Sequence, residues 1–62
     1  MVGFVTARST YYVDQINKVI TGGIFGDKRY GYSQLQAIVG YNAVIVLLNG
    51  QVIRAGIVKK YI

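Results

Sequence analysis

The sequence predicts an all-β protein, folded as one small barrel of about five short strands with one short helical turn. Residues that favour strands (Val, Ile, Tyr, Thr and Phe) recur in short runs, and Gly, Asn and Asp separate these runs. The chain has eight glycines and no proline. Short strands at such close spacing favour a small barrel or a strongly bent sheet. A chain of 62 residues forms one domain, 1–62.

The first strands are predicted in the N-terminal third of the chain. Val2–Arg8 and Thr10–Val13 are runs of strand-forming residues. Asp14–Asn17 is typical of a turn, because Asp and Asn side chains bond to nearby backbone groups. Lys18–Thr21 would then return antiparallel to the second strand.

Glycines separate the next segments. Gly22 and Gly23 permit a positive φ and a sharp change of direction, Ile24–Phe25 is a short apolar plug, and Gly26–Asp27 is another turn. This run matches a phosphate-binding loop only weakly, because no Lys-Ser/Thr pair follows it, and turn geometry explains it better. Lys28–Tyr32 is predicted as a short edge strand or as part of a loop.

Ser33–Val39 is predicted as the helical turn. Ser33 is a favourable N-cap residue, and Gly40 can take the left-handed position after the end of the helix. Because the segment makes barely two turns, a 3-10 or short α turn is expected. Leu35 and Ile38 would share one face and close an end of the barrel.

Asn49-Gly50 lies between two apolar runs and predicts a closing β-hairpin with a two-residue loop. Leu48 would then face Gln51, and this register assigns each residue to one of two faces. The face expected to point into the core carries Val44, Val46, Leu48, Gln51, Ile53, Ala55 and Ile57. The other face contains the only charge of the hairpin and carries Ala43, Ile45, Leu47, Val52, Arg54, Gly56 and Val58.

This second face would expose Ile45, Leu47 and Val52 around Arg54, so the hairpin is apolar on both sides. An exposed apolar patch on a small protein is typical of an interface. We expect a second copy of the chain to cover it, which predicts a homo-oligomer. Cover by the N-terminal strands of the same chain is the alternative.

The pattern V-x-V-x-L-N-G over residues 44–50, followed by G-x-V over 56–58, resembles the central hairpin of small SH3-like barrels. Sm-like RNA-binding proteins carry a similar hairpin. The resemblance covers Val44–Val58 and implies an SH3-like barrel in which Gly56 permits strong bending of the second strand. After Val58 the chain reads KKYI, where an Sm-like protein continues into an Asp-containing uridine-binding loop. The resemblance therefore implies the barrel type and no binding residue.

The composition excludes several kinds of site. The chain lacks cysteine and histidine, and Asp14 and Asp27 are its only carboxylate side chains. We therefore expect no disulfide, no metal site and no cofactor. An enzyme is not expected, because Ser9, Thr10 and Ser33 lack a histidine base and no pair of acids is positioned for proton transfer. Because disulfides and metals are excluded, we expect apolar packing and a subunit interface to stabilise so short a chain.

The composition also favours the cytoplasm. The absence of cysteine fits a reducing compartment, and the apolar run at the N-terminus is too short for a secretion signal. Residues 30–53 carry no charge, but polar side chains interrupt them and the longest apolar run is Ala43–Leu48. Because a spanning helix needs about 20 mostly apolar residues, we expect no membrane span.

Seven basic residues against two acidic ones leave a net charge of +5. Such a charge favours an anionic partner (nucleic acid, a lipid surface or an acidic protein patch), or it serves solubility alone. The cations expected to contact phosphates are Lys28, Arg29, Arg54, Lys59 and Lys60. Solvation of the end of the last strand is the alternative role of Lys59 and Lys60.

Tyr30 and Tyr32 are the candidates for stacking on unpaired bases. In an extended segment Tyr30 and Tyr32 lie on the same face, and packing in or beside the core is their alternative role. Tyr11 and Tyr12 would point to opposite faces of one strand. One of them is then expected in the core and the other on the surface, available to a protein or to a base.

Two functions fit these features. The first is a small, basic, non-enzymatic module that binds nucleic acid through Lys, Arg and Tyr side chains. The alternative is a protein-interaction or inhibitor module that acts through the apolar face of Ile45, Leu47 and Val52. Such a module would suit an accessory protein of a mobile element.

Overall fold

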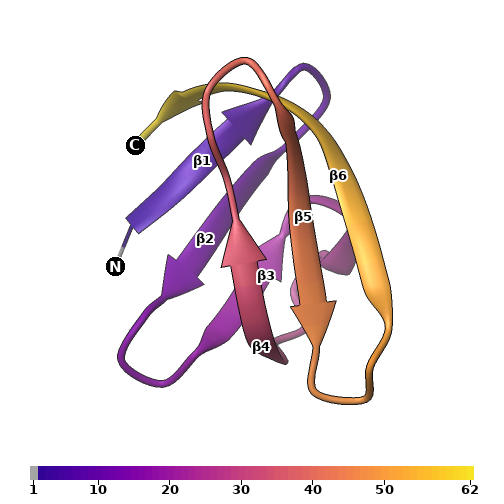
Figure 1. Cartoon of the computed structure of the whole chain (residues 1–62). Coiled ribbons are helices and arrows are strands. Elements are labelled where there is room, and N and C mark those ends of the chain that lie inside the picture. Colours follow the sequence, from indigo (N-terminus) through magenta and orange to yellow (C-terminus); the bar gives the residue numbers. More distant parts are fainter. Residues whose placement is uncertain (1) are drawn as a thin grey trace.

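A computed structural model describes residues 2–62 and shows a closed barrel of six antiparallel strands (Figure 1). Each strand pairs with the next in the chain, and the last pairs with the first. The predicted small all-β barrel is confirmed, with six strands where about five were expected. The elements are β1 (Val2–Thr6), β2 (Thr10–Asp14), β3 (Val19–Gly22), the 3-10 turn η1 (Gly23–Phe25), β4 (Tyr30–Gln36), β5 (Asn42–Leu47) and β6 (Val52–Tyr61).

Two strands belong to both halves of the barrel. β4 pairs with β3 through Tyr30 and Gly31, and with β5 from Tyr32 onward. β6 pairs with β5 as far as Ile57, and with β1 from Val58 onward. Sheet A denotes β1, β2 and β3 with the adjoining ends of β4 and β6, and sheet B denotes β5 with the remainder of β4 and β6.

Gly56 lies where the pairing of β6 with β5 is irregular. Its φ is 97°, in the left-handed region that favours glycine. β6 holds one more residue than β5 between the pairs Asn42–Ile57 and Val44–Arg54, which is a β-bulge. Because a bulge bends and twists its strand, β6 can pass here from sheet B to sheet A.

The core is built from the inward-facing side chains of all six strands. Its largest fully buried side chains are Tyr11, Phe4, Ile20, Ile45, Val13 and Val58. The rings of Phe4 and Tyr11 stack with centroids 5.1 Å apart, and Phe25 of η1 meets the edge of Tyr11 at 6.1 Å. The Tyr11 hydroxyl accepts a hydrogen bond from the Ile24 N–H at 3.3 Å, so the polar end of this buried ring is satisfied. Phe25 is thus the buried half of the predicted apolar plug, whereas Ile24 is exposed.

The β5–β6 hairpin has a three-residue loop, so the predicted two-residue loop is wrong. The Leu47 N–H donates to the Gln51 carbonyl at 2.9 Å, and the Gly50 N–H donates to the Leu47 carbonyl at 2.9 Å. Gly50 has a φ of 89°. A turn followed by a left-handed glycine is a common way to close a three-residue hairpin loop. Relative to the predicted register, the pairing is shifted by one residue.

This shift turns β5 over relative to the prediction, because side chains alternate along a strand. Residues 52–55 of β6 keep the sides that the sequence predicted. Ile45 and Leu47, which were expected outside, lie in the core with exposed fractions of 0% and 4%. Their assignment to an exposed interface is therefore wrong, whereas Val52 does lie outside and is 58% exposed. The outward-facing residues of the hairpin include Val44, Val46, Val52, Arg54 and Ile57.

The helix predicted at Ser33–Val39 is absent, because β4 continues through this segment to Gln36. Leu35 lies opposite Ile45 in the ladder between β4 and β5 and packs against the core. Ile38, which was expected to close the barrel, is exposed in the loop after β4. The helical turn of the fold is instead η1, where glycines precede and follow the buried Phe25.

Candidate nucleic-acid interface

Basic residues lie at both edges of sheet A. Lys28 and Arg29 directly precede β4, whose first residues pair with β3. At the opposite edge, Lys60 of β6 lies across from Val5 of β1, and Lys59 precedes it. The strand order β6-β1-β2-β3-β4 separates the two edges by four strand intervals. At about 4.8 Å per interval, the path around the outer surface through β1, β2 and β3 is roughly 19 Å.

Tyr12 lies near the centre of the outer face of sheet A. It pairs with Gly3 of β1 on one side and with Thr21 of β3 on the other, and it is 44% exposed. Directly opposed residues of an antiparallel ladder point to the same face. Gly3 has no side chain and Thr21 has a small one, so neither can cover the Tyr12 ring.

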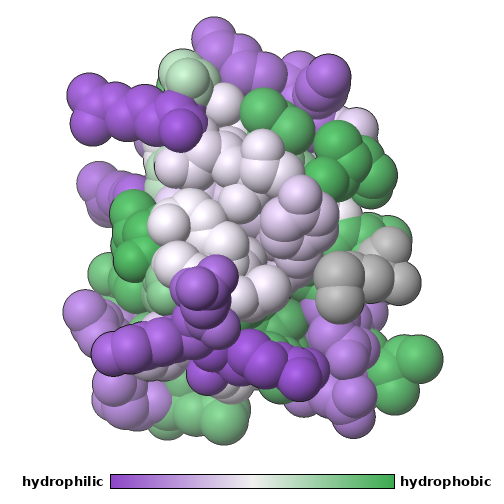
Figure 2. Space-filling view, turned by 180° about the vertical axis from the view of Figure 1, so that it is seen from behind, coloured by the Kyte–Doolittle hydropathy of each residue, from purple (hydrophilic) through white to green (hydrophobic). Residues whose placement is uncertain are grey.

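The face of the molecule that is seen from behind is weakly polar in its centre and has both hydrophilic and hydrophobic side chains at its borders (Figure 2). Figure 2 views the molecule from behind, where β2 and β3 lie in Figure 1. A pale area occupies the middle of this view, strongly hydrophilic side chains project above and below it, and hydrophobic side chains lie to its left and right. An aromatic ring on such a surface is accessible to a planar ligand.

Thr21 holds the loop between β3 and β4 against sheet A. Its hydroxyl lies 2.8 Å from the Lys28 carbonyl and 3.2 Å from the Gly26 carbonyl, and can donate its single proton to either. The Gly22 N–H also donates to the Gly26 carbonyl at 3.0 Å. These bonds keep Lys28, and with it Arg29, beside the strand that neighbours Tyr12.

The Asp14 carboxylate accepts hydrogen bonds within the turn between β2 and β3. A turn at segment 14–17 is what the sequence predicted. Its Oδ1 accepts the backbone N–H groups of Ile16 and Asn17 at 3.1 and 3.2 Å. Its Oδ2 accepts the Asn17 side-chain amide at 2.9 Å. This amide is the largest cause that lowers the pKa of Asp14, and the charge of Arg29 adds to it. Asp14 is therefore an anchored turn residue.

Tyr30 and Tyr32 share a face, as predicted, but that face is directed toward the core. Tyr32 is only 7% exposed, so it cannot stack on a base without leaving the core. Tyr30 lies opposite Ile20 of β3, and its ring centroid is 5.0 Å from that of Phe25. Packing in and beside the core is thus the observed role of both rings.

Arg54 lies apart from the other four cations of the predicted site. It belongs to a row with Gln36 and Val44 that crosses the outer face of sheet B. With Ile38, Tyr41 and Asn42, this row lines an open hollow of about 590 Å³. The structure therefore brings Lys28, Arg29, Lys59 and Lys60 to the two edges of sheet A, and it leaves Arg54 on sheet B.

Tyr12 is absent from the set of site residues that sequence reasoning selected. The sequence signal that could have identified it was the pair Tyr11-Tyr12 in one strand, which predicted one buried and one exposed ring. The structure confirms this expectation and assigns the exposed position to Tyr12.

Within residues 2–62, no three His, Cys, Asp or Glu side chains are grouped so that they could hold a metal ion. In the same part of the chain, no helix has the length and apolar character needed to cross a membrane. Comparisons with protein-family models, curated proteins and solved structures found no match. A function can therefore be inferred only from the fold and from the chemistry of its surface.

Proposed function

We propose that this protein is a small, basic, non-enzymatic β-barrel module that binds single-stranded nucleic acid on the outer face of sheet A. The observation that carries this proposal is the position of Tyr12, an exposed ring between two basic edges of one sheet. Proteins that bind single strands commonly combine aromatic stacking platforms with cations that follow the phosphates. In this proposal the module acts in the cytoplasm.

Each part of the surface has a defined role in this proposal. Tyr12 stacks on one unpaired base, while Lys28 and Arg29 contact phosphates on one side and Lys59 and Lys60 contact phosphates on the other. A duplex fits less well, because its bases are already stacked and paired. The SH3-like barrel type is retained as part of the proposal, since β4 and β6 both pass between the two sheets.

Paired tyrosine variants test the proposal. Fluorescence anisotropy with labelled oligo-dT and oligo-U at low salt would compare the wild type with Tyr12→Ala and Tyr41→Ala. Tyr41 is an exposed tyrosine beside sheet B and serves as the matched control. Tyr12→Ala should weaken binding by about 1–3 kcal/mol, or roughly 5- to 150-fold, and Tyr41→Ala should not. Equal losses in both variants, or no binding by the wild type, would reject the proposal.

The alternative function is a protein-interaction or inhibitor module that acts through the outer face of sheet B. Its supporting observation is the exposure of Val52 and Ile57 beside half-buried Val44 and Val46. Apolar faces of this kind are common at interfaces, and a second copy is the partner that would make a homo-oligomer. Binding through this face should depend little on salt, in contrast to phosphate contacts.

The oligomer is tested by light scattering. Val52→Asp places a charge in the exposed apolar face and should reduce the mass to that of a monomer. Ile16→Asp, in the exposed turn between β2 and β3, is the control and should leave the mass unchanged. A wild-type protein that is already monomeric would remove the homo-oligomer.

A further inference from the structure

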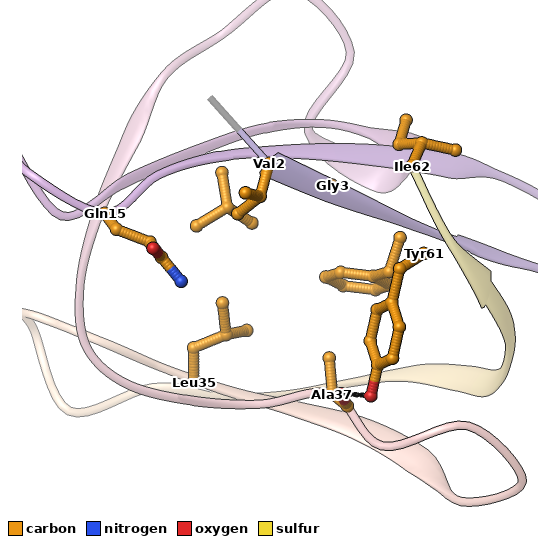
Figure 3. Close-up of a pocket in the computed structure, with 9 residues that line it drawn as sticks. Val2, Gly3, Gln15, Leu35, Ala37, Tyr61 and Ile62 are labelled. Atoms are coloured by element: carbon orange, nitrogen blue, oxygen red, sulfur yellow. Dashed lines mark hydrogen bonds between the residues drawn. The ribbon is translucent and has the colours of Figure 1, made fainter.

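A pocket of about 350 Å³ opens into the side of the barrel (Figure 3). Its walls come from the start of β1, the end of β2, the end of β4 and the end of β6. Phe4 and Val13 line it and belong to the buried core. The pocket therefore reaches from the surface to the packed interior, away from the ring of Tyr12 on the outer face of sheet A.

Hydrogen bonds hold three of these walls together. The Tyr61 hydroxyl donates to the Ala37 carbonyl at 2.6 Å and joins the end of β6 to the segment after β4. The Ile62 N–H donates to the Gly3 carbonyl at 3.0 Å, and the Gly3 N–H donates to the Ile62 carbonyl at 3.3 Å. A pocket whose walls are fixed in this way loses little conformational freedom when it takes up a ligand.

The lining is mostly apolar, and one polar side chain in it makes no hydrogen bond to another lining residue. The apolar side chains include those of Val2, Phe4, Val13, Leu35 and Ala37, whereas the Ile62 side chain points away from the pocket (Figure 3). Of the two polar side chains, Tyr61 already donates its proton to Ala37, whereas Gln15 extends its amide into the space between Val2 and Leu35 (Figure 3). None of the nine lining residues carries a charged side chain. Small-molecule pockets typically combine an apolar lining with a few convergent polar groups.

We propose that this pocket binds a short, uncharged aliphatic molecule whose one hydrogen-bonding group pairs with the Gln15 amide. The volume holds about ten non-hydrogen atoms at roughly 30 Å³ each. A charged ligand is disfavoured because burial of an ion without a partner is costly. A primary amide suits the site best, since the Gln15 amide both donates and accepts. This inference goes beyond the nucleic-acid function and does not depend on it.

Three ligands with the same six-carbon chain test the proposal on the full protein. Hexanamide, hexanoate and hexylammonium would be titrated into ¹⁵N-labelled protein, and backbone amide shifts recorded. Hexanamide should shift the signals of lining residues such as Phe4, Val13 and Leu35, and should bind at least about fivefold tighter than either charged analogue. Tighter binding of hexanoate would mean that the net charge of +5 attracts the ligand, and would overturn the proposal.

Two variants locate the binding. Ala37→Leu fills the pocket while its backbone carbonyl remains available to Tyr61, and it should abolish hexanamide binding. Gln15→Leu removes the side-chain amide at an exposed position, so the fold should be unaffected. This variant should weaken the binding of hexanamide about fivefold or more. Gln51→Leu, in the exposed loop between β5 and β6, is the matched control and should bind as the wild type does. Unchanged binding in Gln15→Leu would overturn the proposal even if Ala37→Leu failed to fold.

Discussion

Tyr11 and Tyr12 are neighbours in the chain and point to opposite sides of β2. Tyr11 is 1% exposed and stacks on Phe4 inside the barrel, whereas Tyr12 is 44% exposed between Gly3 and Thr21. Consecutive residues of a strand alternate in this way. One strand therefore supplies both an anchor of the core and the proposed stacking platform.

The two rings should differ sharply in their contribution to folding. Tyr11→Ala leaves a large cavity and should cost about 3–5 kcal/mol, a large part of the stability of a domain this size. Tyr12→Ala removes an exposed side chain and should cost no more than about 1 kcal/mol. Urea denaturation followed by circular dichroism measures both. Equal losses would contradict the assignment of Tyr11 to the core and of Tyr12 to the surface.

Two aspartate substitutions distinguish the faces of the β5–β6 hairpin. Leu47→Asp would bury a carboxylate in the core without a partner and should prevent folding. Val52→Asp lies on the outer face and should leave the fold intact. Circular dichroism at neutral pH separates the two outcomes. A folded Leu47→Asp protein would show that this residue faces solvent.

Two glycines with left-handed backbone provide a matched pair. Gly23 has a φ of 50°, and a Cβ there would collide with the ring of Tyr11. Gly40 has a φ of 92°, and a Cβ there would meet open space. Both alanine variants carry the cost of the left-handed conformation, so the collision should make Gly23→Ala worse by about 1–3 kcal/mol. Equal melting temperatures would mean that η1 does not pack on Tyr11 as described.

Asp14 should make the stability depend on acid pH. The Asn17 side chain, followed by its backbone N–H, holds the pKa of Asp14 below its ordinary value of 3.8. Because the unfolded chain takes up this proton at the higher pH, the stabilisation is complete above 3.8 and is lost as the pH falls through the folded pKa. Asn17→Ala should raise the pKa of Asp14 toward 3.8, as measured by NMR titration of the carboxyl carbon. An unchanged titration would show that the amide has no such effect.

The fold class could be predicted from local chemistry, but the register of the hairpin could not. Asn49-Gly50 suits a two-residue loop, yet Gly50 also suits the left-handed position that closes a three-residue loop. The hydrophobic pattern could not decide between them, because both faces of the hairpin are apolar. The error moved Ile45 and Leu47 from the core to the surface, whereas residues 52–55 of β6 were assigned to the correct sides.

The segment after Tyr32 shows how pairing outweighs weak helix signals. Ser33 and Gly40 are suitable helix boundaries, but the segment between them is too short to form a stable helix alone. Pairing of Leu35 with Ile45 satisfies the backbone and places an apolar side chain against the core. The alternation of Leu35 with exposed Gln34 and Gln36 was the strand signal in the sequence.

The candidate site was predictable in its charges and not in its aromatic residue. Cations are recognisable in any sequence, and Lys28, Arg29, Lys59 and Lys60 are exposed in the fold. Whether a tyrosine of a strand faces the core depends on how that strand sits in the barrel. Tyr32 faces inward and Tyr12 outward, which only the three-dimensional arrangement shows.

The salt dependence of single-stranded DNA binding tests the central claim most directly. The plot of log affinity against log salt for oligo-dT should fall with a slope of about −0.7 for each contacted phosphate. Replacing Lys59 and Lys60 together by Gln should reduce the magnitude of the slope by about 1.4, while Arg54→Gln on sheet B should leave it unchanged. An absence of binding at low salt, or an equal change of slope in the Arg54→Gln variant, would contradict a nucleic-acid surface on sheet A.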